Sequence, residues 1–217
     1  MIFTFFIKPT GIALFGALLG VIAFAMYDRI QKPVLRIAMI TGLSVLLILL
    51  ANEMMSKYLI MENYQVGEII YDVRTYTGDA PTGGLAIDPP NDLYFPLQSL
   101  PAVVKIFLFA ICNPLYWTKL TALKIYYLLS HTRPFWSSVH NFYSLLILIP
   151  SYVLSLVSFR RLDKPVLIFA TTFLLIHILS VGITSEDWDG RFLMPLLPAI
   201  FILSGIAINF TFKPKVS

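Results

Sequence analysis

Charged side chains are scarce in this sequence. Asp, Glu, Lys and Arg make up 13% of its 217 residues and hydrophobic side chains make up 58%, whereas roughly 25% of the residues of a soluble domain are charged. This composition excludes an ordinary soluble domain. Several apolar stretches approach the roughly 17 to 25 residues that a helix needs to cross a hydrocarbon core. We therefore expect an all-α, polytopic membrane protein in which residues 1–217 form a single membrane domain.

Cysteine and the usual catalytic motifs are scarce as well. The single cysteine, Cys112, excludes an intrachain disulfide. The sequence has no Gly-Lys phosphate loop, no histidine pair at metal-binding spacing and no nucleophilic serine flanked by glycines. These absences disfavour nucleotide hydrolases, zinc proteases and serine hydrolases, and they leave the catalytic residues and metal ligands unassigned. A divalent cation held by loop carboxylates is the one cofactor that the sequence suggests.

The apolar stretches predict about five membrane-spanning helices. The first is expected to be retained, because no basic stretch precedes it and no small-residue cleavage site follows it. Pro150 lies within one expected span, where membrane helices tolerate proline. The spans are expected near residues 10–27, 34–54, 142–158, 165–183 and 192–210.

The charges between the spans predict an orientation, because Lys and Arg in short loops prefer the cytoplasmic side. The connections "DRIQKPVLR" and "FRRLDK" and the tail "FKPKVS" are basic and fall on one side of a five-helix arrangement. Residues 55–100 and "TSEDWDGR" are acidic and fall on the other side. We expect an N-terminus outside and a C-terminus in the cytoplasm of a plasma or inner membrane. The net charge of +4 is dispersed among short loops and does not predict a nucleic-acid partner.

The segment between the second and third spans is expected to stay on the outer face. Residues 55–100 form an external loop whose Gly pair and prolines prevent a continuous helix. Residues 101–141 are read as interfacial helices or a re-entrant pair, because a single crossing there would place the basic "FRRLDK" outside. Basic side chains alternate with aromatic ones in this region, which suits a surface that meets anionic lipid phosphates; they are Lys105, Lys119, Lys124 and Arg133.

Acidic residues and one arginine crowd together just before the last predicted span. Glu186, Asp187 and Asp189 could act as general bases or bind a cation, although an acidic external loop is also what the topology predicts. Arg191, at the outer end of the span, could fork onto a lipid phosphate. The alternative is that Arg191 pairs with Asp187 or Asp189 or anchors the helix.

One histidine lies inside a predicted span. His177 is roughly two helical turns from the outer end of its span, and an ionisable group at that depth is a functional hypothesis. A neutral imidazole that is hydrogen-bonded across helices is the alternative. The sequence alone leaves both readings open.

Several short motifs, and the order in which they follow one another along the chain, resemble the later part of GT-C-type membrane glycosyltransferases. These enzymes take a sugar from a polyprenyl-phosphate donor. The matching stretches are "KPTG" at Lys8 to Gly11, "FAICNPLYW", "RPFW" and above all "EDWDGRFLMPLLP". The resemblance implies that Arg191, with Lys8 or Arg133, contacts the donor phosphate. It also implies that the loop at 184–191 and the long external loop together shape the sugar and acceptor site at the outer face.

The sequence departs from that family at the position of the catalytic carboxylate. The family carries this residue in a large external loop after the first span, whereas here the first span is followed by a short basic loop. The resemblance therefore implies a C-terminal half or partial chain that meets membrane lipid, a polyprenyl-phosphate sugar and a separate catalytic subunit. The alternative is a non-catalytic polytopic subunit that serves as a scaffold or a transporter component.

Overall fold

The computed structural model describes residues 9–58, 60–74 and 83–212. Within these residues the chain is helical, with two isolated β-bridges and no strand. The expected all-α, polytopic fold is confirmed. The predicted external loop at 55–100 is described only in part, and Lys8 and most of the tail "FKPKVS" lie outside the described residues.

Four helices are long and apolar enough to cross a membrane, so the chain is an integral membrane protein in contact with lipid. They agree with the predicted spans at 10–27, 34–54, 142–158 and 165–183. The helix containing Pro150 begins at Ser138, earlier than expected, with Ser137 accepting a hydrogen bond from the amide of His140 at its N-terminus. The four helices are α2 (Pro9–Arg29), α3 (Pro33–Met55), α8 (Ser138–Ser158) and α9 (Lys164–Ile183), with the short η1 (Phe159–Arg161) between the last two.

The last apolar helix, α10 (Leu197–Phe212), begins later than the predicted span at 192–210. The predicted start is wrong because residues 191–196 form turns, in which Leu196 N donates to the carbonyl of Leu193 at 2.9 Å. Pro195 lies in these turns, and Pro198 occupies the first turn of α10, where its missing N–H costs nothing. With 16 residues, α10 is about 24 Å long and shorter than a hydrocarbon core of about 30 Å.

Helix α10 packs beside α8 through serine side chains. Ser155 Oγ donates to the carbonyl of Ile200 at 2.8 Å, and Ser204 Oγ donates to the carbonyl of Ser151 at 2.7 Å. Small polar residues at such an interface let two apolar helices approach closely. These bonds join α8 and α10 over about one turn of each helix.

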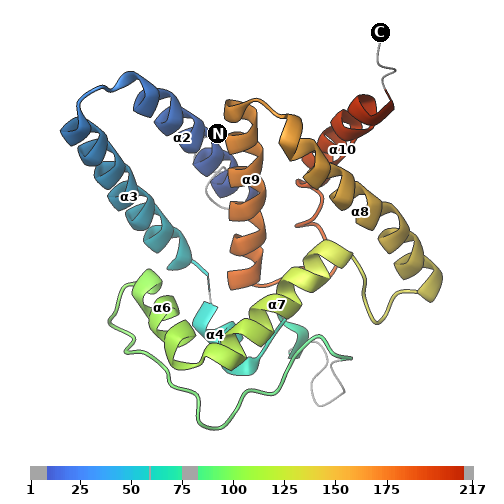
Figure 1. Ribbon diagram of the computed structural model, residues 1–217. Helices are drawn as coiled ribbons and strands as arrows, with labels where there is room; N and C mark the ends of the chain where they lie inside the picture. Colours follow the sequence, from blue (N-terminus) through green and yellow to red (C-terminus); the bar gives the residue numbers. More distant parts are fainter. Residues whose placement is uncertain (1–8, 59, 75–82, 213–217) are drawn as a thin grey trace.

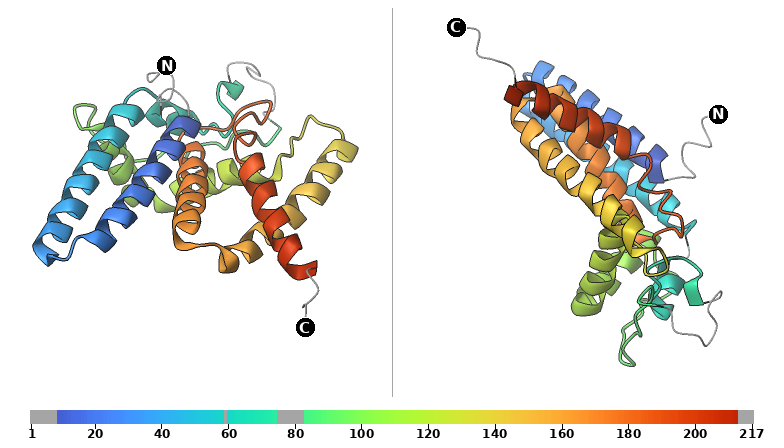
Figure 2. Two further views of the ribbon diagram at one scale, coloured as in Figure 1. Left: turned by 90° about the horizontal axis from the view of Figure 1, so that it is seen from above. Right: turned by 90° about the vertical axis from the view of Figure 1, so that its right-hand side faces the viewer.

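The chain between α3 and α8 lies at one end of the bundle (Figures 1 and 2). It contains α4 (Ile60–Val66), α6 (Ala102–Cys112) and α7 (Pro114–Ser130), and α6 and α7 meet at an angle of 111°. Helices α3 and α9 end here, and α2 and α8 begin here (Figure 1). We call this the capped end. By length and composition this bent pair has the pattern of a broken span or of a re-entrant loop, so the interfacial or re-entrant arrangement of residues 101–141 stays a prediction.

Helix α3 is the loosest part of the bundle. Helices α2 and α9 pack closely, because Gly16 leaves no space for a Cβ atom against Ile176. In contrast, none of the residues in the span Pro33–Glu53 is buried in the protein, and α3 leans away from α2 and α9 towards the capped end (Figure 1). Its exposed aliphatic side chains face lipid or the space between these helices.

Candidate functional site

The acidic loop before α10 is folded into the capped end. Glu186 N donates to the carbonyl of Ile69 at 2.9 Å, and Tyr71 N donates to the carbonyl of Glu186 at 3.1 Å. These bonds tie the α9–α10 loop to the segment that follows α4. The Glu186 side chain is fully buried, so it does not present a carboxylate to the exterior as the sequence suggested.

Arg133 pairs with this carboxylate. Its Nη2 donates to Glu186 Oε1 at 3.1 Å, and neither side chain is exposed. A guanidinium carries five N–H donors, and all five are used here. The remaining four go to the carbonyl oxygens of Tyr127, Thr132, Asp187 and Trp188. Arg133 therefore has no donor left for a lipid phosphate and instead joins the α7–α8 loop to the α9–α10 loop.

The buried carboxyl of Glu186 is incompletely satisfied. Its Oε2 has no hydrogen-bond partner among the described residues. Burial raises the pKa of Glu186 to about 7, although Arg133 acts in the opposite direction. Removing one partner from such a buried pair leaves an uncompensated charge, which makes the pair important for stability once it has formed.

Asp187 and Arg191 form a second ion pair at the surface of the loop. Arg191 Nε and Nη2 donate to the two Asp187 oxygens at 2.7 and 3.1 Å, so the alternative that the sequence left open for Arg191 is the one observed. Burial opposes ionisation of Asp187, but the forked bond from Arg191 outweighs it and keeps the pKa of Asp187 below its ordinary value. Asp189 is exposed and lies 3.9 Å from Arg191.

His177 is buried and bonded across elements. Its Nε2 lies 2.7 Å from the carbonyl oxygen of Phe192, so it joins α9 to the turns before α10. Of the alternative that the sequence analysis gave for it, the hydrogen bond to another element is observed, with a partner in a turn and not in a helix. Apart from Lys8, which lies outside the described residues, the predicted site residues thus lie close together at the capped end, but their polar groups are largely engaged with one another and with the backbone.

No family model, no curated protein and no solved structure matches this chain.

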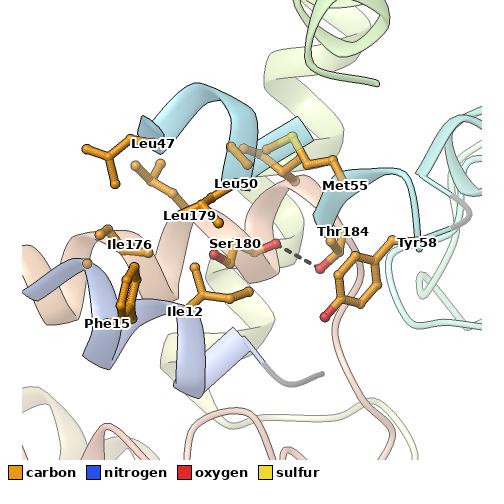
Figure 3. Close-up of a pocket in the computed structure, with 13 residues that line it drawn as sticks. Ile12, Phe15, Leu47, Leu50, Met55, Tyr58, Ile176, Leu179, Ser180 and Thr184 are labelled. Atoms are coloured by element: carbon orange, nitrogen blue, oxygen red, sulfur yellow. Dashed lines mark hydrogen bonds between the residues drawn. The ribbon is translucent and has the colours of Figure 1, made fainter. Parts of the chain in front are cut away.

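An apolar cavity of about 320 Å³ lies between α2, α3 and α9. Figure 3 shows Ile12 and Phe15 from α2, Leu47 and Leu50 from α3, and Ile176 and Leu179 from α9 pointing into it. The Thr184 hydroxyl at its edge donates to the carbonyl of Ser180 at 2.8 Å, drawn as a dashed line in Figure 3. The cavity exists because α3 leans away from the other two helices.

The apolar space continues along α3 in the other direction. A second cavity, of about 260 Å³, lies between α2 and α3 and shares Leu47 with the first. Its lining includes Phe24 and Tyr27 from α2 and Met39 from α3. The two cavities together follow α3 from near its start to its end at Met55.

A polar cavity of about 280 Å³ adjoins the apolar one at the capped end. The two share Met55 and Tyr58 in their linings. The first turn of α6 forms part of the polar cavity, and its polar side chains come from four separate segments of the chain. They are Asn52, Ser56, Glu62, Gln98 and Lys105.

Sequence reasoning missed this arrangement, apart from naming Lys105 among the interfacial cations. The tilt of α3 is a tertiary property, and no local pattern in the sequence encodes it. Among the described residues no group of three or more His, Cys, Asp or Glu side chains could hold a metal ion. The arrangement can hold an apolar chain whose polar end lies in the cavity lined by Lys105.

Proposed function

We propose that this protein is a membrane glycosyltransferase-like chain that binds a polyprenyl-phosphate-linked sugar, with the polyprenyl chain in the cavity between α2, α3 and α9. The observation that carries the proposal is the contiguity of an apolar and a polar cavity around Met55 and Tyr58. In this arrangement the capped end lies at the outer face of the membrane, with the N-terminus outside and the C-terminus in the cytoplasm.

The chemistry of lipid bilayers explains why both cavities are needed. A polyprenyl chain gains no hydrophobic free energy when it leaves lipid for an apolar cavity, because lipid tails are equally apolar. The apolar cavity therefore selects the chain by its shape, and the polar headgroup supplies the affinity through hydrogen bonds and charge. A lipid held in this way has its phosphate and sugar at the capped end.

The transfer step itself requires a carboxylate base. An acceptor hydroxyl oxygen attacks the anomeric carbon, the bond from that carbon to the phosphate oxygen breaks, and the base takes the hydroxyl proton. In the described residues the buried carboxylates of Glu186 and Asp187 are engaged with arginines. The family that this chain resembles carries its catalytic carboxylate in a large external loop after the first span, where this chain has a short basic loop. We therefore place the base on a separate catalytic part, to which this chain supplies the donor-binding half.

A non-catalytic membrane subunit is the second candidate. It is favoured by the same ion pairs, since the acidic loop connects structural elements of the capped end instead of facing a reactant. Glycosyl transfer after reconstitution with a catalytic partner would favour the first candidate. Movement of a lipid or solute across proteoliposomes without transfer would favour the second.

Two neighbouring leucines of α3 give a matched test of chain binding. Leu50 lines the apolar cavity, whereas Leu49 is 62% exposed and is not part of the lining. Leu50→Trp fills the cavity and should lower the binding of a photoactivatable polyprenyl phosphate about tenfold, while Leu49→Trp should leave it unchanged. Equal binding by both variants and the unmodified protein would exclude the cavity as the chain site.

A further inference from the structure

Lys105 stands out among the cations of the capped end. Among the described residues its side-chain ammonium forms neither a hydrogen bond nor an ion pair, and the residue is half-buried in the wall of the polar cavity. Lys119 of α7 is exposed and lines none of the three cavities, and five other cations at this end are already engaged by carboxylates, carbonyl oxygens or an aromatic ring. These are Lys57, Arg74, Lys124, Arg133 and Arg191.

Lys105 is held in place by the contact between α6 and α3. Asn52 Oδ1, near the end of α3, accepts a hydrogen bond from Val103 N at 3.3 Å. Lys105 lies two residues further along α6, so its position relative to the end of α3 is fixed. The junction between the apolar and polar cavities, at Met55, is formed by the last turn of the same helix α3.

The remaining charge in the polar cavity is a carboxylate. Glu62 from α4 lines the cavity, is exposed and forms no ion pair within the described residues. Lys105 and Glu62 thus line one cavity without pairing with each other. An anionic group in this cavity would be attracted by Lys105 and repelled by Glu62, with an energy that depends on its distance from each.

We propose that the polar cavity binds the phosphate of an amphipathic lipid whose chain lies between α2, α3 and α9, and that Lys105 donates to that phosphate. This inference rests on the proposed function and names the residue that recognises the headgroup. A lysine acts on a phosphate as a compact positive charge. Asn52, Ser56 and Gln98 add neutral polar groups around it.

The test compares lysines that differ in position but not in chemistry. Lys119 lies on the exposed face of α7 and lines none of the three cavities described above. In detergent-solubilised full chain, Lys105→Gln should weaken the binding of polyprenyl monophosphate about tenfold to a hundredfold, as expected for the loss of a charge-assisted hydrogen bond. Lys119→Gln should leave it unchanged, and Lys105→Arg should retain most of it.

Uncharged polyprenol separates this inference from the proposed function. Polyprenol binding should fall in Leu50→Trp and remain unchanged in Lys105→Gln. If Leu50→Trp weakens both ligands while Lys105→Gln weakens neither, the chain site stands and the phosphate site is overturned. If Leu50→Trp weakens neither ligand, the proposed chain site fails, whatever Lys105→Gln does.

Glu62→Gln tests which kind of headgroup binds, because the affinity should rise for one kind and fall for the other. For a phosphate without a positive group, removing the Glu62 charge should strengthen binding. A headgroup that carries both a phosphate and an ammonium would lose affinity in both Glu62→Gln and Lys105→Gln, and that result would overturn the assignment to a polyprenyl monophosphate. Glu62 is exposed, so this variant also tests the proposal if Lys105→Gln does not fold.

Discussion

The acidic loop with Arg133 and the cavity beside α3 are opposite kinds of region at the same end of the molecule. The loop concentrates charge and is tightly bonded: Arg133 uses all its donors, and Glu186 joins two segments through its backbone. The α3 side has few bonds, and its span contains no buried residue. The comparison teaches that dense charge here stabilises the fold, whereas the space for a ligand arises where packing is incomplete.

The largest expected effect of a substitution is at Glu186. Glu186→Ala leaves the Arg133 guanidinium buried without its carboxylate, so the free energy of unfolding should fall by about 3–5 kcal/mol. Thermal or denaturant unfolding in detergent measures this. Asp189→Ala, at an exposed carboxylate of the same loop, should change stability by less than about 0.5 kcal/mol. Similar losses in both variants would contradict the structural role of the buried pair.

The pH dependence of stability should report the same pair. The pKa of Glu186 is raised from 4.5 to about 7 in the folded protein. At pH values between these two, the carboxyl is therefore more protonated in the folded than in the unfolded state. The contribution of Glu186 to stability is therefore full below pH 4.5 and is lost as the pH rises through about 7, with a slope of at most about 1.4 kcal/mol per pH unit.

The control for this pH dependence is Glu186→Gln. Burial lowers the pKa of His131, which acts in the opposite direction, because that contribution is lost as the pH falls. The informative quantity is therefore the free energy of unfolding of the unmodified protein minus that of Glu186→Gln. This difference should decrease as the pH rises. A pH-independent difference would mean that Glu186 does not titrate in this range.

Glycine substitutions sharpen the comparison of packing. Gly190 adopts a positive φ of 68°, and a Cβ atom there would collide with the ring of His131. Gly190→Ala should destabilise the protein by about 1–3 kcal/mol. Gly42 of α3 has no atom within 4 Å of the place a Cβ would take, so Gly42→Ala should not destabilise. A loss at Gly42 equal to that at Gly190 would refute the loose packing of α3.

A small effect on stability is also expected at the cavity itself. Leu50→Trp should change the unfolding free energy by less than about 1 kcal/mol, because the ring enters space that other side chains leave unfilled. Differential scanning fluorimetry on the same samples used for binding measures this. A large destabilisation would mean that Leu50 is packed and that no cavity exists there.

Composition and apolar length were enough to predict the all-α, polytopic fold and four of the span positions. The start of α10 was misplaced because Pro195 and Pro198 were both read as part of the helix, whereas the chain turns at residues 191–196 before it begins. An apolar sequence does not distinguish such turns from a helix. The proline spacing alone could have placed the boundary at Pro198, since proline is favoured in a first turn.

The candidate site was less accessible to sequence reasoning. The concentration of charged residues in the sequence pointed to Arg191, Glu186 and Arg133. Which arginine pairs with which carboxylate depends on tertiary distances that no local pattern gives. His177 and Arg191 took the alternatives that had been left open for them. The cavity beside α3 depends on the angle between helices, which side-chain packing sets after the spans have formed.

Mapping where a lipid crosslinks tests the central claim most directly. A photoactivatable group placed on the chain of a polyprenyl phosphate should label residues that line the apolar cavity, such as Leu47 and Leu50 of α3 and Leu179 of α9, as identified by peptide mass spectrometry. Labelling confined to the acidic loop at 184–191, or spread evenly over the lipid-facing sides of all the helices, would contradict the account.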